Sequence, residues 1–70
     1  MITDYRKKMG TRIAELRAQK GWSQAELAEK VGLRQLHINR VENGQYSTGI
    51  DILGKMADVL GCDIDFIERR

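Results

Sequence analysis

The side chains that most often carry out catalysis or bind metals are scarce in this chain of 70 residues. His37 is the single histidine, Cys62 is the single cysteine, and the carboxylates form no cluster along the sequence. A nucleophile with its base, or a metal site, needs several such groups together. One cysteine can form no disulfide within the chain, so a buried reduced thiol is expected. The sequence therefore argues against an enzyme, a metal site and a bound cofactor.

Charge is divided unevenly along the chain, although the net charge is only +2. Residues 1–50 contain nine Lys and Arg against five Asp and Glu, whereas the last twenty contain three against five. The first part is the candidate anion-binding part, and this bias is compatible with nucleic acid as a partner. A solvated helix surface would have the same composition, so charge alone does not decide the function.

Length and apolar content indicate one folded domain over residues 1–70. Apolar residues make up 41% of the chain, which is typical of globular domains. The apolar runs are two or three residues long, far below the roughly 20 that span a bilayer, and the N-terminus lacks the apolar segment of a signal peptide. We therefore expect a cytoplasmic protein with no membrane partner. A chain this short buries a small core, so it needs a partner or very regular helices.

Three helices are predicted from apolar residues at helical spacing. These residues are Tyr5, Met9, Ile13 and Leu16, then Leu33, Ile38 and Val41, then Leu53, Met56, Ala57 and Leu60. The helices should end at Gly21, at Asn43-Gly44 and at Gly61, because these residues tolerate the positive φ that follows many helices.

A further helix is predicted between the first two by its start signal. Ser23 and Glu26 have the spacing of a capping box, and Trp22 can pack on Leu27 as a hydrophobic staple. This helix should begin at Gln24 and last about two turns, until Gly32 forces a bend. The sequence thus predicts two short helices on either side of one tight turn.

The tail after the fourth helix allows two interpretations. Cys62, Ile64 and Phe66 alternate with aspartates, as in a half-buried strand, whereas Ile64 and Ile67 alone suit one turn of helix. We favour the strand, because the aspartates would share one face and the apolar residues the other.

The segment Gln24–Gly44, QAELAEKVGLRQLHINRVENG, resembles the helix-turn-helix core of the Cro/cI-type repressors, the xenobiotic-response-element family. The resemblance extends over roughly residues 9–61, because MGTRIAELRAQKGWS and IDILGKMADVLG are similar to that family's first and fourth helices. Two short helices joined by a tight turn can also place the second one in a major groove. The resemblance implies an all-α four-helix DNA-binding domain with its helix-turn-helix core at 24–43. The alternation after the fourth helix predicts a dimerisation tail at 62–70.

The resemblance implies that the third helix reads bases. Its outward positions by helical spacing are Arg34, Gln35, Leu36, Asn39 and Arg40. Gln and Asn can pair with adenine, Arg with guanine, and an exposed Leu with a thymine methyl group. Without the motif, the polar members would be read as an ordinary surface, and Leu36 could instead pack under a neighbouring helix. Arg34 stands where the family usually has a small hydroxyl residue, so the sequence does not identify the residue that caps the start of this helix.

Phosphate contacts are expected around the reading helix. Gln24, at the N-terminus of the second helix, offers its amide and nearby backbone N–H groups to a phosphate. His37 stands where the family commonly has Ser or Thr, and it either packs against the second helix or touches phosphate. The other candidates, which could also be a simple polar turn, are Asn43, Tyr46, Ser47 and Thr48.

The family pattern pairs an arginine of the first helix with a glutamate near the end of the third, matched here by Arg17 and Glu42. A partly buried bidentate ion pair would lock the reading helix to the scaffold. The role expected for this pair is structural.

The predicted function is equilibrium binding to a double-stranded DNA operator, so that occupancy changes transcription, most simply as a repressor. Two half-sites require a homodimer, and the predicted tail strand with Ile64 and Phe66 would pair with its copy. The alternative is the antitoxin of a toxin-antitoxin pair, which binds a toxin and represses its own operon. The tail CDIDFIERR resembles the strand that follows the fourth helix in some such antitoxins.

Overall fold

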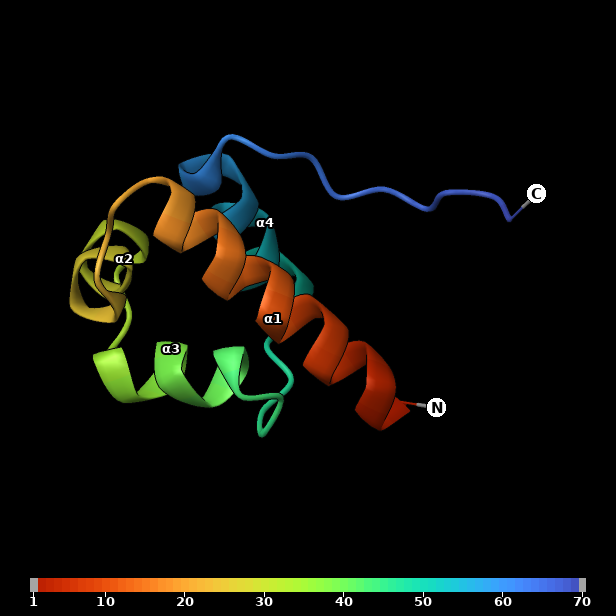
Figure 1. Ribbon diagram of the computed structural model, residues 1–70, viewed down its shortest axis with the longest axis horizontal. Coiled ribbons are helices and arrows are strands. Elements are labelled where there is room, and N and C mark those ends of the chain that lie inside the picture. Colours follow the sequence, from red (N-terminus) through yellow and green to blue (C-terminus); the bar gives the residue numbers. More distant parts are fainter. Residues whose placement is uncertain (1, 70) are drawn as a thin grey trace.

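The computed structural model describes residues 2–69, with side chains from Tyr5 onward. This part of the chain contains four helices: α1 (Ile2–Gln19), α2 (Gln24–Val31), α3 (Gln35–Glu42) and α4 (Ile50–Leu60). In Figure 1, α1 runs diagonally across the front, α4 lies behind it, and α2 and α3 lie at one side. The all-α class and the four predicted helices are confirmed. None of the described helices is long and apolar enough to cross a membrane.

The core lies where the four helices converge. Its buried apolar side chains are Ile13, Leu27, Ala28, Val31, Ile38, Val41, Met56 and Leu60. Leu27 and Ile38 are fully excluded from solvent, and burial of a side chain of this size stabilises a fold by about 1.5–3 kcal/mol. Because α2 and α3 each supply members of this cluster, the helix-turn-helix is fixed by the same contacts that hold the domain together.

The start of α2 forms as the sequence predicts. Glu26 donates its backbone N–H to Ser23 Oγ at 3.1 Å, and Ser23 donates its backbone N–H to Glu26 Oε1 at 2.9 Å. These reciprocal bonds satisfy two backbone groups that a helix N-terminus leaves without partners. The helix ends at Gly32, whose φ of +84° is the left-handed conformation that glycine adopts most easily.

The start of α3 differs from the prediction. Leu33, expected on the inner face of this helix, lies in the turn, where it is partly buried against the core. The helix begins at Gln35, after Arg34, which has an extended backbone and makes no capping bond with its side chain. The apolar pattern placed the start of α3 too early, because a turn residue that packs against the core is apolar for the same reason as a helix residue that does so.

One close backbone approach joins α1 to α3. Gly10 is buried, and a Cβ added there would lie 2.7 Å from the carbonyl oxygen of Glu42 and closer still to that of Val41. Only a glycine permits this spacing, because the neighbouring atoms belong to backbone and cannot rotate away. Gly10 therefore sets the distance between the scaffold helix and α3.

The N-terminal half of α1 extends beyond the core. Tyr5 and Met9, which continue the apolar spacing of this helix, are 56% and 39% exposed. The 18 residues of α1 span about 27 Å, whereas the 11 of α4 span about 17 Å, so the shorter helix cannot cover the longer one. The apolar face of α1 therefore extends beyond the part that the core covers.

The tail has neither of the predicted structures. Residues 62–69 contain no strand and no helix, and they extend away from the globule (Figure 1). Phe66 is completely exposed and Ile67 is 84% exposed. Cys62 is partly buried rather than fully buried. A strand needs a neighbouring strand to bond with, and the described part of this chain offers none.

Candidate nucleic-acid interface

The outer face of α3 presents most of the predicted reading side chains. Arg34, Gln35, Leu36 and Arg40 are exposed, and Asn39 is partly buried. Leu36 is 56% exposed, so it does not pack under a neighbouring helix. The core residues Ile38 and Val41 occupy the opposite face. A single helix thus carries apolar anchors on one side and guanidinium, amide and methyl groups on the other.

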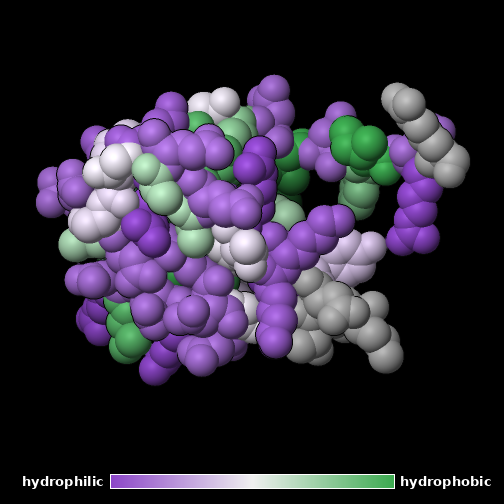
Figure 2. Space-filling model, in the orientation of Figure 1, coloured by the Kyte–Doolittle hydropathy of each residue, from purple (hydrophilic) through white to green (hydrophobic). Residues whose placement is uncertain are grey.

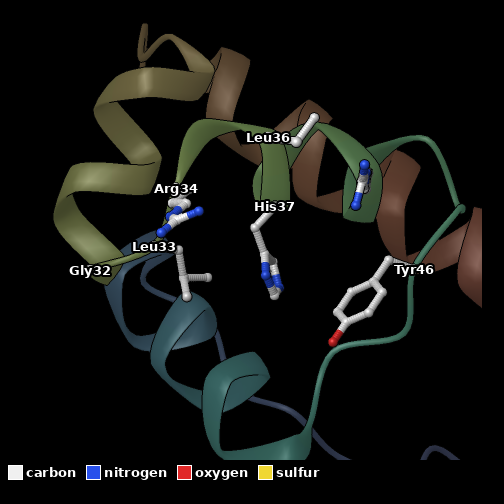
Figure 3. Close-up of a pocket in the computed structure, with 7 residues that line it drawn as sticks. Gly32, Leu33, Arg34, Leu36, His37 and Tyr46 are labelled. Atoms are coloured by element: carbon white, nitrogen blue, oxygen red, sulfur yellow. The ribbon is translucent and has the colours of Figure 1, made fainter.

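A groove of about 470 Å³ lies between the turn, the exposed side of α3 and the loop that follows it. The residues that line it are Gly32, Leu33, Arg34, Leu36, His37, Arg40 and Tyr46. Figure 3 shows His37 pointing from α3 into the groove, with Arg34 and Leu33 on one side of it and Tyr46 of the loop on the other. The groove is lined by two guanidinium groups and no carboxylate, which favours an anionic ligand.

His37 connects α3 to the following loop and not to α2. Its ring meets the ring of Tyr46 edge to face, with centroids 4.9 Å apart and an interplanar angle of 77°. Its Nε2 lies 3.4 Å from Thr48 Oγ1. These contacts hold the loop that carries Tyr46 and Thr48 against α3. The predicted packing against the second helix is wrong, because the His37 side chain lies on the loop side of α3.

The Arg17–Glu42 ion pair is bidentate. Arg17 Nε donates to Glu42 Oε2 at 2.6 Å and Nη2 to Oε1 at 2.9 Å, while Nη1 donates to the carbonyl oxygen of Trp22 at 2.8 Å. The Glu42 side chain is 4% exposed and that of Arg17 is 18% exposed. The hydrogen bonds to Glu42 raise the pKa of Arg17 above its ordinary value, against the opposing effect of desolvation. This pair joins α1, the α1–α2 turn and the end of α3.

A chain of three side-chain amides continues from Glu42 to the surface of α3. Gln24 Nε2 donates to Glu42 Oε1 at 2.9 Å, Asn39 Nδ2 donates to Gln24 Oε1 at 3.3 Å, and Asn43 Nδ2 donates to Asn39 Oδ1 at 3.3 Å. An ionised carboxylate only accepts hydrogen bonds. Glu42 therefore fixes which end of the Gln24 amide faces Asn39, and Gln24 in turn fixes Asn39.

This amide chain was not predicted from the sequence. From the sequence, Gln24 is expected to contact a phosphate and Asn39 to contact a base, and no hydrogen bond between the two is predicted. The four-residue spacing of Asn39 and Asn43 is the one local signal for it. The Gln24–Glu42 bond links residues 18 apart, which no local pattern reveals. No group of three or more potential metal ligands occurs among residues that the structure describes.

Comparison with known proteins gives one consistent family. The helix-turn-helix family model matches residues 13–67. An uncharacterized HTH-type transcriptional regulator of Archaeoglobus fulgidus is 42% identical over 57 residues, which cover 81% of this chain and 81% of that protein. The HTH-type transcriptional regulator SinR of Bacillus subtilis is 37% identical over 80% of this chain and 51% of its own length. Antitoxin HipB of Escherichia coli is 38% identical over 79% of this chain and 58% of its own.

Solved structures agree with this result. The restriction-modification controller protein C.AhdI from Aeromonas hydrophila matches with a TM-score of 0.82 and 35% identity, over 86% of this chain and 91% of that one. SinR in complex with DNA matches with a TM-score of 0.72 and 38% identity, over 79% of this chain and 89% of that one.

Proposed function

Since this chain belongs to the helix-turn-helix family, we infer that it is a sequence-specific DNA-binding protein that regulates transcription. The observation that carries this conclusion is the exposed face of α3, with Gln35, Leu36 and Arg40 held on a buried scaffold. These side chains match the donors, acceptors and methyl contacts that the major groove presents. The relatives are transcriptional regulators rather than enzymes.

We propose that Arg34, Gln35, Leu36, Asn39 and Arg40 read bases. Asn39 takes part although it is partly buried and already bonded to two amides. Its side chain retains one N–H and one oxygen lone pair, which are the two groups that recognition of adenine needs. The amide chain thus fixes the orientation of the Asn39 side chain and leaves one donor and one acceptor free, so that its N–H and its oxygen face DNA in one defined arrangement.

The residues that we propose to contact phosphates lie around the base-reading residues of α3. We assign phosphate contacts to Gln24, His37, Asn43, Tyr46, Ser47 and Thr48, and the backbone N–H groups in the first turn of α2 support Gln24 in this role. The amide of Gln24 is engaged by Glu42 and Asn39, so one of its N–H groups is left for a phosphate. These contacts set the register of α3 on the duplex.

The proposed mechanism is occupancy of an operator, most simply repression, in the cytoplasm where the DNA lies. Two-fold helix-turn-helix proteins bind half-sites that are one helical turn apart, about 34–36 Å. A domain of this size reaches both only as a homodimer. We propose that Ile64 and Phe66, which are exposed apolar residues of the tail, mediate that dimer.

Site selection from random duplex DNA tests the function directly. We expect a defined site, bound with an affinity that falls steeply with added salt. On that site, Gln35→Ala or Arg40→Ala should cost about 1–3 kcal/mol and relax the preference at one base pair. Asn43→Ala is the matched comparison: Gln24 still orients Asn39, so all sequences should weaken alike. Failure to enrich any sequence would refute the function, and equal losses for all three variants would refute the assignment of readers.

A second candidate function has one specific observation in its favour, the similarity to antitoxin HipB. An antitoxin would bind DNA with the same α3 face and a toxin with another surface. Co-expression with the product of the adjacent gene, followed by mass measurement of the purified material, separates the two. A stoichiometric complex supports the antitoxin, whereas a chain that purifies without that product supports a regulator acting alone.

A further inference from the structure

An apolar groove lies on the side of the molecule formed by α1 and α4, away from the amide chain. Its volume is about 290 Å³. The apolar residues that line it are Met9, Ile13, Leu16, Leu53, Met56, Ala57, Leu60, Cys62 and Ile64, together with Arg12 and Asp63. Met9 and Ile64, at its edges, are 39% and 43% exposed. The groove reaches into the core, because Ile13, Met56 and Leu60 are core residues.

The tail beyond this groove carries the most exposed apolar side chains of the described chain. Phe66 is fully exposed and Ile67 is 84% exposed. Figure 2 shows that the tail, which stands clear of the globule, presents a hydrophobic surface between hydrophilic stretches. Side chains of this size in full contact with water indicate a surface that another molecule covers. The eight residues from Cys62 to Arg69 can span about 26 Å when extended.

The outer part of the tail and the hollow on α1 beside the groove carry mainly opposite charges, apart from Arg69 in the tail and Glu15 in the hollow. Asp65 and Glu68 flank Phe66 and Ile67, whereas Asp63 lines the groove of its own chain. Lys8 and Arg12 lie on α1, in a hollow beside the groove, and Arg12 also lines the groove. The pairing of Arg12 with Glu15 at 3.4 Å is exposed and therefore weak. The tail thus complements this face of an identical molecule in both charge and apolar character, as a two-fold contact requires.

We propose that the tail of a second copy occupies the groove. Phe66 of each chain enters between α1 and α4 of its partner, and the carboxylates of Asp65 and Glu68 lie against Lys8 and Arg12 of that partner. The reciprocal exchange covers both tails and both grooves. This inference builds on the homodimer named under the proposed function, and it assigns the surface that forms it. The reading face of α3 stays free for DNA because no α3 residue lines the groove.

Charge reversal of the full-length chain, without DNA, tests the exchange by sedimentation equilibrium. One variant carries Asp65→Lys and Glu68→Lys, and the other carries Lys8→Glu and Arg12→Glu. Each variant alone places like charges between tail and groove, so its dimer dissociation constant should rise by about tenfold or more. An equimolar mixture places opposite charges at both contacts, so a heterodimer should form with nearly the affinity of the unmodified chain.

The same experiment separates the exchange from its alternatives. If the tails instead pair with each other as strands and leave the groove empty, the variant with Lys8→Glu and Arg12→Glu stays as dimeric as the unmodified chain, which would refute the groove as the binding surface. If each tail folds over its own groove, or if the chain does not dimerise, the unmodified chain sediments as a monomer. That result would refute the exchange, whereas specific DNA binding by the same sample would leave the proposed function standing.

A second pair of variants tests the apolar contact. Phe66→Ala should raise the dissociation constant on the order of 100-fold or more, because a buried aromatic side chain is lost from each of the two contacts. Ile50→Ala removes a side chain that is 68% exposed and does not line the groove, and it should leave the dimer unchanged. Equal behaviour of the two variants would refute the placement of Phe66. Unchanged circular dichroism for both would exclude misfolding as the cause.

Discussion

Replacement of Glu42 by glutamine perturbs the point at which scaffold and reading helix meet. The carboxylate accepts three hydrogen bonds, two from Arg17 and one from Gln24. A glutamine of the same shape has one oxygen and one NH₂ group, so at least one of these donors would face another donor. Arg17, whose side chain is only 18% exposed, would also lose its opposite charge.

The expected cost follows from these contacts. Removal of one partner of a buried ion pair costs about 3–5 kcal/mol. Arg17 keeps its bond to Trp22 and some contact with water, so we expect the lower end, about 3 kcal/mol. In a domain of this size each kcal/mol lowers Tm by about 4–8 °C, which predicts a decrease of about 12–24 °C.

Thermal and urea unfolding at neutral pH, followed by circular dichroism, measure this cost. The control is Glu29→Gln, because Glu29 is exposed and its replacement should change Tm little. Site selection below the Tm of the variant then tests the amide chain. Loss of the carboxylate frees Gln24 to reverse its amide, so the base preference opposite Asn39 should broaden. A cost below about 1 kcal/mol, together with an unchanged base preference, would show that Glu42 neither locks α3 nor orients Asn39.

Three further predictions concern stability and binding. Gly10→Ala should destabilise the domain by about 1–3 kcal/mol or more, because the new methyl group meets the backbone of α3. Gly54→Ala is the control: a Cβ there meets nothing within 4 Å, so this change should stabilise α4 by about 0.5–1 kcal/mol. Comparable midpoints of urea unfolding for the two variants would contradict the close approach at Gly10. Hydrogen bonds from Ser23, above all from its backbone N–H, lower the pKa of Glu26 below its ordinary 4.5, so its contribution to stability is present above that pH and is lost as the pH falls through the lower folded-state value. Unfolding measured from pH 6 to pH 2 should therefore show a smaller acid loss for Glu26→Gln, and identical pH profiles would rule out this contribution. Because we propose that Arg40 reads a base, Arg40→Gln should leave the slope of log affinity against log salt concentration unchanged. A slope smaller by about one would show that Arg40 contacts a phosphate instead.

Local signals in the sequence determined the helices and the turn. The capping box of Ser23 and Glu26 and the left-handed Gly32 and Gly61 each depend on residues within about four positions, a distance over which helix geometry is fixed by the chain itself. The same regularity placed Ile38 and Val41 inside and left Gln35 and Arg40 outside. The pairing of Arg17 with Glu42 followed from the family resemblance rather than from any local rule.

Only the tertiary structure decided how these elements meet. The bond between Gln24 and Glu42, the contact of His37 with Tyr46, and the spacing set by Gly10 all depend on the angle and distance between packed elements. An apolar pattern specifies that a residue is apolar but not which element it belongs to, so Leu33 was placed in a helix. Helix periodicity acts over a few residues, whereas the orientation of Asn39 depends on the carboxylate of Glu42 in its own helix and the amide of Gln24 in α2, two residues 18 positions apart that only packing brings together.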